Sequence, residues 1–260
     1  MMFAQERKER ILALLKEKKR VDINELIETF QVSGATLRSD IRELENMGLL
    51  TRTHGGALYK EDVYTPENTI YDRKTLHLEE KQAIARKSLS FLEPGDTILL
   101  DSGTTTLELA RLLKNGWHLT VITNDIPIAQ ELQDSEEISL VFIGGSVRTH
   151  FECTFGAAAL EFLSTLSVDK LFLSPNALSL SRGASTPSLE IAGLKKAMIS
   201  SAKEVYMLCD SSKVGTRAAN TFAGLKEFTG MITDQGILAG DLEALKEQGM
   251  PVFVADERKE

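Results

Sequence analysis

The chain has 260 residues, of which 42% are hydrophobic and 26% are charged, and its formal net charge is −8. This apolar content excludes a disordered chain, and the lack of any run of about 18 apolar residues argues against a membrane span. The two cysteines, Cys153 and Cys209, are too few for a disulfide framework and too isolated for a zinc site. The N-terminus lacks the apolar core of a signal peptide. We therefore expect a cytoplasmic protein with no metal and no cofactor.

The charge is distributed unevenly along the chain. Residues 1–60 contain 11 Lys and Arg against 9 Asp and Glu, a net charge of +2, whereas the remaining 200 residues contain 19 against 29, a net charge of −10. A slightly basic part joined to an acidic remainder predicts two domains with different tasks. We place the first domain at residues 1–59, a polar linker at residues 60–78, and the second domain at residues 79–260.

Apolar residues at helical spacing predict three helices in the first domain. The first covers Gln5–Lys18. Asp22 is placed to cap a second helix of about two turns, and Ser33 to cap a third that runs to Met47, with Gly48 as its left-handed C-cap. Two short helices joined by a tight turn form a helix-turn-helix pattern.

The third helix turns its apolar side chains inward and leaves polar and basic side chains on its outer face. Such a face is typical of a recognition helix in the major groove of double-stranded DNA, although a winged helix can also serve protein–protein contacts. Two short extended runs follow, on either side of a Gly55-Gly56 turn that can adopt positive φ, and they predict a wing. The residues expected to contact DNA are Ser33, Thr36, Arg38, Ser39, Arg42, Arg52, His54 and Gly55.

Short apolar runs alternate with helical stretches through the second domain, beginning with a helix near residues 79–91. Expected strands cover residues 97–101, 119–123, 138–143, 170–174, 205–209, 228–233 and 252–255, and expected helices cover 126–132, 157–163 and 189–202. This alternation predicts a mostly parallel sheet covered on both faces. The predicted fold class is therefore α/β, with a small N-terminal winged helix-turn-helix followed by a mostly parallel α/β domain.

Ligands of such sheets bind beyond the carboxyl ends of the strands. There the segment from Asp101 to Thr106, Asp-Ser-Gly-Thr-Thr-Thr, joins a strand to the start of a helix. Its hydroxyls and backbone N–H groups could hold an anion, whereas a simple capped helix start would need only one Ser or Thr. Lys213 follows a later strand and should reach the same rim, where its charge would favour a phosphate.

Both domains resemble the DeoR family of bacterial transcription regulators. In the first domain the resemblance rests on Ser33 to Leu50 and on Arg52-Thr53-His54-Gly55-Gly56-Ala57, with Ser39 where the family usually has a second Arg. In the second it rests on the segments from Gly95 to Leu109, from Val121 to Asn124, Gly144-Gly145, from Asp169 to Phe172, and from Asp210 to Lys213. Together these stretches extend over nearly the whole chain.

The resemblance implies a repressor of a carbohydrate-utilisation operon, with a second domain similar in fold to ribose-5-phosphate isomerase. Its partners would be a double-stranded DNA operator and a phosphorylated sugar effector. Few cationic side chains contact DNA from one copy, so we expect a homo-oligomer, dimer or tetramer, on repeated half-sites. By resemblance the effector-binding residues are Asp101, Gly103, Thr104, Thr105, Thr106, Asn124 and Lys213.

The alternative is a sugar-phosphate isomerase-like enzyme with an accessory winged helix. Such an enzyme needs a general base and a general acid at the sugar carbon atoms. The isomerase resemblance predicts an acidic stretch where this chain has Ser174 to Leu178, which contains no carboxylate, and nothing places Glu152 or Glu190 at a substrate. We therefore expect no catalytic residues and no enzymatic activity.

Overall fold

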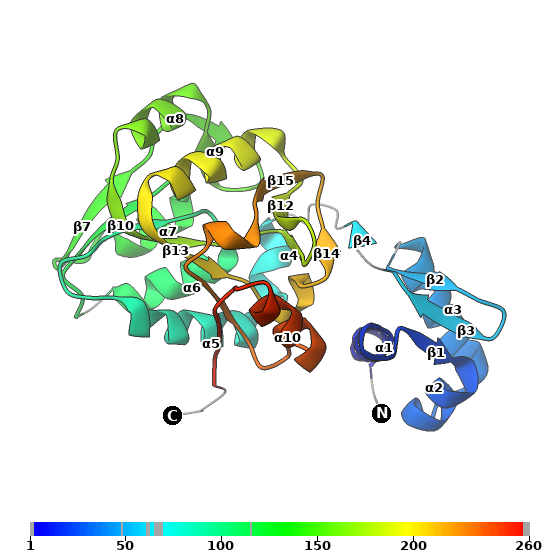
Figure 1. Cartoon of the computed structure of the whole chain (residues 1–260). Helices are drawn as coiled ribbons and strands as arrows, with labels where there is room; N and C mark the ends of the chain where they lie inside the picture. The colour runs from blue at the N-terminus through cyan, green and yellow to red at the C-terminus, as the bar shows by residue number, and fades with distance from the viewer. Residues whose placement is uncertain (1–2, 48, 61–62, 65–69, 115, 257–260) are drawn as a thin grey trace. The chain divides into compact units, whose positions relative to one another are not determined.

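The computed structural model describes residues 3–47, 49–60, 63–64, 70–114 and 116–256. The chain forms two compact units, Met1–Tyr64 and Thr65–Glu260, which are described in turn (Figure 1). Among the described residues, no helix is both long enough and apolar enough to span a bilayer.

The first unit contains the three predicted helices and a small sheet. Its elements are α1 Ala4–Lys18, β1 Arg20–Asp22, α2 Ile23–Phe30, α3 Gly34–Asn46, β2 Leu50–Arg52, β3 Gly56–Tyr59 and β4 Val63–Tyr64. Both predicted N-caps are confirmed, because the Asp22 carboxylate accepts the Asn24 N–H at 2.8 Å and the Ser33 hydroxyl accepts the Thr36 N–H at 3.2 Å. The predicted cap Gly48 lies outside the described residues.

The wing contains one strand more than predicted. Strand β1, which the sequence did not indicate, joins the two predicted strands in a sheet of order β1-β3-β2. Neither Gly55 nor Gly56 has a positive φ, so the turn does not use that freedom of glycine. Glycine is needed at position 56 for another reason, since a Cβ atom there would lie 2.0 Å from the carbonyl oxygen of Val21. The close approach of β3 to β1 therefore excludes any side chain at this position.

A buried ion pair joins α1 to α3. Arg7 Nε lies 2.6 Å from Asp40 Oδ2, Arg7 Nη2 lies 3.2 Å from Asp40 Oδ1, and both side chains are buried. Replacing Arg7 by alanine should leave the Asp40 charge buried and unpaired, which costs about 3 kcal/mol. We expect amide hydrogen exchange in α3 of the full chain to accelerate accordingly.

Lys8 provides the matched control, because it pairs with the exposed Glu43 across the same two helices. Lys8→Ala should change the protection of α3 by less than about 1 kcal/mol, as is usual for exposed pairs. Equal effects of the two substitutions would mean that burial of the Arg7–Asp40 pair does not set the stability of this unit.

The second unit is built on a seven-stranded sheet of order β17-β16-β13-β10-β5-β6-β7, in which all neighbours run parallel. These strands are β5 Thr97–Leu100, β6 Leu119–Thr123, β7 Ile138–Phe142, β10 Val168–Leu173, β13 Ala202–Leu208, β16 Gly230–Thr233 and β17 Val252–Val254. The main helices are α5 Leu78–Ser88, α6 Thr104–Leu113, α7 Ile126–Leu132, α8 Ala157–Ser164, α9 Leu189–Ser200 and α10 Ala239–Glu247. The predicted α/β fold class is confirmed.

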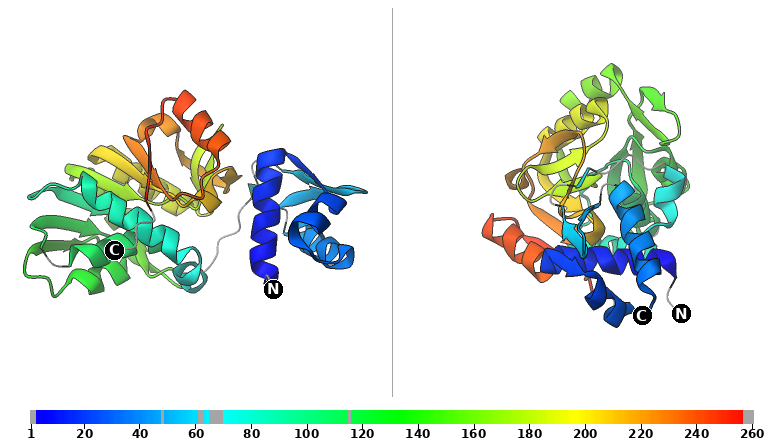
Figure 2. Two further views of the ribbon diagram at one scale, coloured as in Figure 1. Left: turned by 90° about the horizontal axis from the view of Figure 1, so that it is seen from below. Right: turned by 90° about the vertical axis from the view of Figure 1, so that its right-hand side faces the viewer.

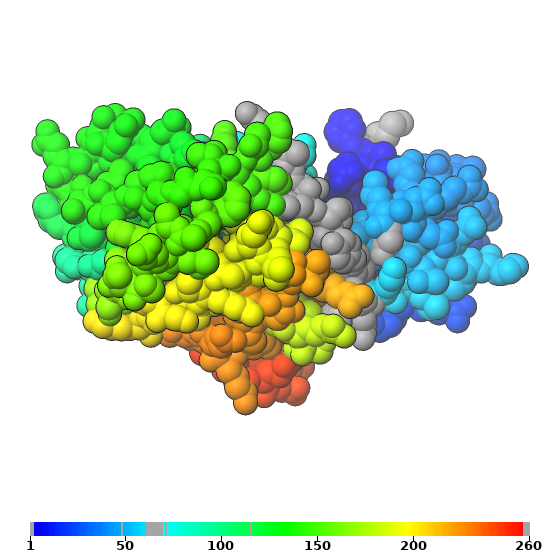
Figure 3. Space-filling model, turned by 90° about the horizontal axis from the view of Figure 1, so that it is seen from above, coloured from blue at the N-terminus to red at the C-terminus, as the bar shows by residue number. Residues whose placement is uncertain are grey.

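Side chains on the two faces of this sheet belong to two hydrophobic cores. Phe172 packs with Ile98 and with residues of α5, α6 and α7, whereas its neighbours Leu171 and Leu173 pack with residues of α8 and α9. Alternate residues of a strand point to opposite faces, so helices must cover both. Figure 1 and the left panel of Figure 2 show α5 and α6 on one side of the sheet, and Figure 3 shows the opposite side, where α9 in yellow forms the outer layer.

Several short elements of the second unit were not predicted. They include the helix α4 Ile70–Thr75, the hairpin β8 Ser146–Arg148 with β9 Cys153–Phe155, and the 3-10 turn η2 Ser211–Lys213. A further sheet has the order β11-β12-β15, with β11 Ala177–Ser179, β12 Gly183–Thr186 and β15 Asn220–Ala223. Helix α4 lies within residues 60–78, the segment expected to be a linker. The domain boundaries at residues 59 and 79 stay a prediction.

Candidate DNA-binding surface and effector pocket

The outer face of α3 and the wing together line a hollow on the first unit. Of the residues expected to contact DNA, five line this hollow: Arg38, Arg42, Arg52, His54 and Gly55. Ser39 is exposed on α3 beside them. Ser33 and Thr36 lie at the start of the helix, where their hydroxyls are 2.9 Å apart and Ser33 caps the first turn.

The electrostatics of this hollow are dominated by arginine. Arg38 and Arg42 are one helical turn apart, both are exposed, and neither has an acidic partner within the part of the chain that the structure describes. Arg52 differs, because its Nε lies 3.4 Å from Glu45 Oε2 and its backbone N–H donates to Glu45 Oε1 at 3.1 Å. Glu45 thus ties the wing to α3 and partly neutralises Arg52, while Arg38 and Arg42 keep their full charge for phosphates or base edges.

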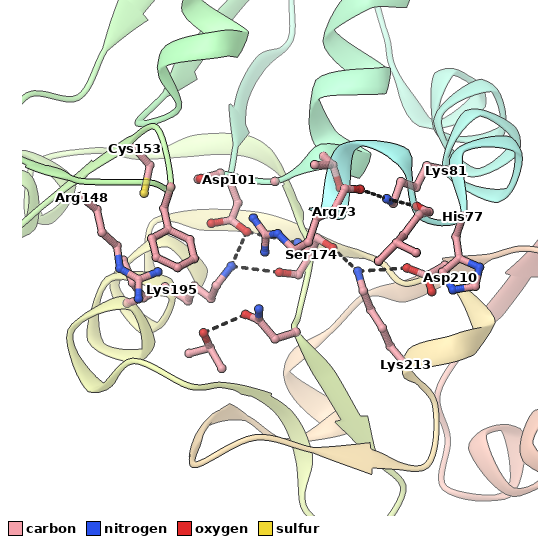
Figure 4. Close-up of a pocket in the computed structure, with 18 of the residues that line it drawn as sticks. Arg73, His77, Lys81, Asp101, Arg148, Cys153, Ser174, Lys195, Asp210 and Lys213 are labelled. Carbon is pink, nitrogen blue, oxygen red and sulfur yellow. Dashed lines mark hydrogen bonds and ion pairs between the residues drawn. The ribbon is translucent and has the colours of Figure 1, made fainter. Parts of the chain in front are cut away.

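A pocket lies at the carboxyl ends of four neighbouring strands of the second unit (Figure 4). Asp101, Asn124 and Ser174 directly follow β5, β6 and β10, and Asp210 comes two residues after β13. Since parallel strands end at the same edge of a sheet, residues far apart in sequence meet here.

The structure brings five of the seven predicted effector residues to this pocket. These are Asp101, Gly103, Thr104, Asn124 and Lys213. The other two, Thr105 and Thr106, are buried and do not line it, because successive residues of a helix point in different directions. The Thr106 hydroxyl instead donates to the carbonyl oxygens of Asp101 and Gly103 at 2.7 and 2.8 Å, and so it stabilises the loop.

Two lysine–carboxylate pairs flank Ser174 in the pocket. Lys195 Nζ contacts Asp101 Oδ2 and donates to the Ser174 carbonyl oxygen at 3.0 Å. Lys213 Nζ lies 3.0 Å from Asp210 Oδ2 and 3.2 Å from Ser174 Oγ. Burial alone would raise the pKa of Asp210, but the nearby Lys213 charge and the Ser212 hydroxyl lower it to about 2. Asp210 is therefore ionised at neutral pH.

Sequence reasoning missed most of the cationic side chains of the pocket. Arg73, Lys81, Arg148 and Lys195 all line it, together with His77. Lys195 had an available signal, since it interrupts the apolar stripe of α9, and a lysine on a buried face needs a partner. The others lie on short elements or among ordinary surface charges, where the sequence gives no such signal.

Asn124 offers the pocket a buried hydrogen-bond acceptor. Its Nδ2 donates to the Thr154 carbonyl oxygen at 2.8 Å, whereas its buried Oδ1 has no hydrogen-bond partner among the described residues. A buried acceptor of this kind favours a ligand that supplies a donor, such as a sugar hydroxyl.

His150, Glu152 and Cys153 are close together in the sequence, but Glu152 and Cys153 have different surroundings in the structure. Glu152 pairs with Lys74 at 2.8 Å, and Cys153 is buried at the pocket. Within the described residues no cluster of His, Cys, Asp and Glu could hold a metal ion. Cys209 is buried.

Family models for two domains match the chain in succession. A DeoR-like helix-turn-helix domain matches residues 7–63, and a DeoR C terminal sensor domain matches residues 76–235. The chain belongs to the DeoR family. The predicted resemblance is confirmed, and as a DeoR-family member this protein is a DNA-binding transcription regulator.

Several similar proteins extend over almost the whole DeoR-family chain. The putative aga operon transcriptional repressor of Escherichia coli O157:H7 is 32% identical over 97% of this chain and 94% of its own length. The HTH-type transcriptional regulator GlpR of Haloferax volcanii is 34% identical over 96% and 98%. The lactose phosphotransferase system repressor of Staphylococcus epidermidis is 34% identical over 90% and 93%.

Solved structures of ribose 5-phosphate isomerases match part of the chain. The enzyme from Methanocaldococcus jannaschii has a TM-score of 0.40 and 18% identity over 53% of this chain and 55% of its own. Ribose 5 phosphate isomerase A from Neisseria gonorrhoeae has a TM-score of 0.39 and 12% identity over 53% of each chain. No functional conclusion follows from matches of this strength.

Proposed function

We propose that this DeoR-family protein is a cytoplasmic, homo-oligomeric repressor of a carbohydrate-utilisation operon, and that a phosphorylated sugar controls its binding to the operator. One observation carries the proposal: a single chain combines an exposed arginine pair on the third helix with a cationic pocket at the strand ends of the other unit. The relatives named as repressors of the aga operon and of the lactose phosphotransferase system support the same role.

The phosphate of the effector is expected at the start of α6. Ser102, Gly103 and Thr104 line the pocket there, and the first backbone N–H groups of a helix have no partner within the helix. Lys213 and Lys81 add positive charge to the same pocket. The N–H groups would orient the phosphate oxygens while the lysines balance their charge.

The sugar hydroxyls are expected at the acceptors of the pocket. The carboxylate of Asp101 and the unpartnered Oδ1 of Asn124 can both accept hydrogen bonds from the O–H groups of a sugar. A site that donates to phosphate and accepts from hydroxyls is selective for phosphorylated polyols over inorganic phosphate.

Isomerase activity is not part of the proposal. Asp101 and Asp210 are the carboxylates that line the pocket within the described chain, and each is paired with a lysine. The charge of Lys213 and the Ser212 hydroxyl lower the pKa of Asp210 to about 2 despite its burial, which makes this carboxylate a poor general base at neutral pH. The segment from Ser174 to Leu178 supplies no other carboxylate.

The proposal is tested by a gel shift on DNA upstream of the protein's own operon, titrated with a panel of sugar phosphates. We expect a specific shift of the DNA band, and we expect one class of sugar phosphate either to weaken or to strengthen it. DNA binding that no phosphorylated sugar alters would overturn the assignment of the effector. The absence of any shift at low salt would overturn the assignment of the first unit as the part that binds the operator.

Effector binding should weaken at alkaline pH because of Lys81. Burial, with the neighbouring charge of Lys213, lowers the pKa of Lys81 to about 8. An anionic phosphate favours the protonated amine, so affinity should fall roughly tenfold as the pH rises from 7.5 to 9.5 and Lys81 loses its proton. Phosphate itself is already dianionic in this range, and Asp125, whose pKa burial raises to about 7, is largely ionised.

Calorimetric titration of the effector at several pH values measures this dependence. Lys81→Met should bind more weakly at pH 7.5 and lose most of the decline between pH 7.5 and 9.5. An unchanged decline in the variant would assign the titration to another group.

A further inference from the structure

The short helix α4 contributes to the wall of the pocket. It covers Ile70–Thr75, whereas the two family models match residues 7–63 and 76–235, so α4 lies between the two matched domains in the sequence. Arg73 of this helix and Leu76 directly after it line the pocket. A segment outside both domain models therefore forms part of the site where we expect the effector.

Helix α4 depends on its surroundings to stay folded. It has 6 residues, and isolated helices shorter than about 12 residues are marginal in water. Its Ile70 side chain is buried, the helix lies against α6, and Lys74 Nζ lies 2.8 Å from Glu152 Oε2 in the turn of the β8–β9 hairpin. The joint between α4 and α5 also needs support, because His77 there has a φ of 52°, which is uncommon for a residue with a side chain.

A further support of α4 comes from a residue of the pocket. The ammonium of Lys81, a buried side chain of α5, donates to the carbonyl oxygens of Arg73 and Leu76 at the end of α4 (Figure 4). Carbonyl groups in the last turn of a helix have no partner within the helix, and a cation there also interacts favourably with the helix dipole. Lys81 is thus both a C-terminal cap of α4 and a residue that lines the pocket.

The charge of Lys213 opposes this cap. Burial and the Lys213 charge lower the pKa of Lys81 to about 8. An anionic group near both lysines would reverse this effect, because it attracts each ammonium and favours its protonated form. Two of the three N–H groups of the Lys81 ammonium serve α4 in the described chain, which leaves one for an anion in the pocket.

We propose that a phosphorylated effector holds α4 against the second unit through Lys81, and that α4 passes the state of the pocket to the chain that connects it to the first unit. This inference rests on the proposed function and adds the element on which the effector acts. If the effector binds more tightly when α4 is in place, each must favour the other, because coupling between two equilibria is reciprocal.

Hydrogen exchange of the full chain, measured by mass spectrometry, tests one direction of this coupling. The probes are the panel of sugar phosphates, including ribose 5-phosphate and fructose 6-phosphate, and calorimetric titration identifies those that bind. A bound sugar phosphate should slow amide exchange in residues 70–77 by about tenfold or more. Exchange in α10, a helix outside the pocket, should stay within about twofold.

The variant Lys81→Met tests the cap itself. Without any ligand it should exchange faster than the unchanged protein in residues 70–77, and a saturating sugar phosphate should no longer slow this exchange. Unchanged exchange of α4 in this variant would overturn the inference, whichever compounds bind.

The variant Ile70→Ala tests the reverse direction, because Ile70 is buried but does not line the pocket. Truncating it should release α4 and weaken sugar-phosphate binding by about tenfold or more, and the milder Ile70→Val should act in the same direction. The control Leu245→Ala truncates a buried side chain of α10 and should leave the affinity within about twofold. Circular dichroism checks that the variants are folded.

Two results would overturn this inference and leave the proposed function standing. One is a sugar phosphate that binds without slowing exchange in α4, and the other is normal affinity in the Ile70 variants while α4 exchanges faster. No binding by any sugar phosphate of the panel would overturn the proposed function itself.

Discussion

Replacing Arg38 and Arg42 together by alanine should weaken binding to the operator by more than about 100-fold. The two side chains are exposed on one face of α3, and neither has an acidic partner among the described residues. Each charged hydrogen bond lost to a phosphate or a base edge is worth about 1.5–3 kcal/mol, and two such losses exceed a factor of about 100. Fluorescence anisotropy with an operator fragment at fixed salt concentration measures the effect.

The control for this variant removes the same charge elsewhere. Arg86 and Arg182 are exposed arginines of the second unit, so Arg86→Ala with Arg182→Ala makes the same change in net charge. We expect this control to bind within about threefold of the unchanged protein, and we expect both variants to keep their helical circular dichroism. Strong DNA binding by the α3 variant would contradict the assignment of α3 as a recognition helix. It would favour a first unit that contacts another protein.

Removing the Lys213 charge should uncouple the effector from DNA binding. Lys213→Gln alone would leave Asp210 buried and unpaired, so it is combined with Asp210→Asn, which removes both charges of the pair. Loss of a charged hydrogen bond to phosphate should weaken effector binding by roughly 30-fold, or about 2 kcal/mol. DNA binding without effector should be unchanged, because neither residue lies in the first unit.

A surface pair of the same unit gives the matched comparison. Lys203 Nζ lies 2.8 Å from Asp169 Oδ1 outside the pocket, so Lys203→Gln with Asp169→Asn neutralises an equivalent pair. Calorimetric titration should show normal effector affinity in this control. If the Lys213 variant also bound the effector normally, the phosphate would not be at Lys213.

The elements of this fold that the sequence predicted well are those with strong local signals. Helix α7 and strand β6 were predicted with their observed bounds, because Asp125 caps the helix and the strand is a short apolar run between polar residues. The hairpin β8–β9 has no such signal, since its strands are short and mostly not buried. Arg148, which lies on this hairpin, could therefore not be placed in the pocket from the sequence.

In the candidate site too, the residues that were predicted are those with a local signal in the sequence. Asp101, Asn124 and Lys213 follow strands directly or closely, and parallel topology is enough to bring such positions together. The prediction included all of Thr104, Thr105 and Thr106, because the sequence does not show which of the three side chains faces the pocket. Of these three, Thr104 lines it. Lys195 reaches Asp101 from α9, a contact between residues 94 positions apart that no local pattern encodes.

The lack of space around Gly56 limits how the first unit can change its preference for a DNA sequence. Any larger residue there would clash with the Val21 carbonyl oxygen and break the pairing of β3 with β1. The angle between wing and helix is therefore not adjustable by substitution at this position. Under selection for a new operator, the accessible route is exchange of exposed side chains on α3, such as Ser39, while the framework that presents them stays constant.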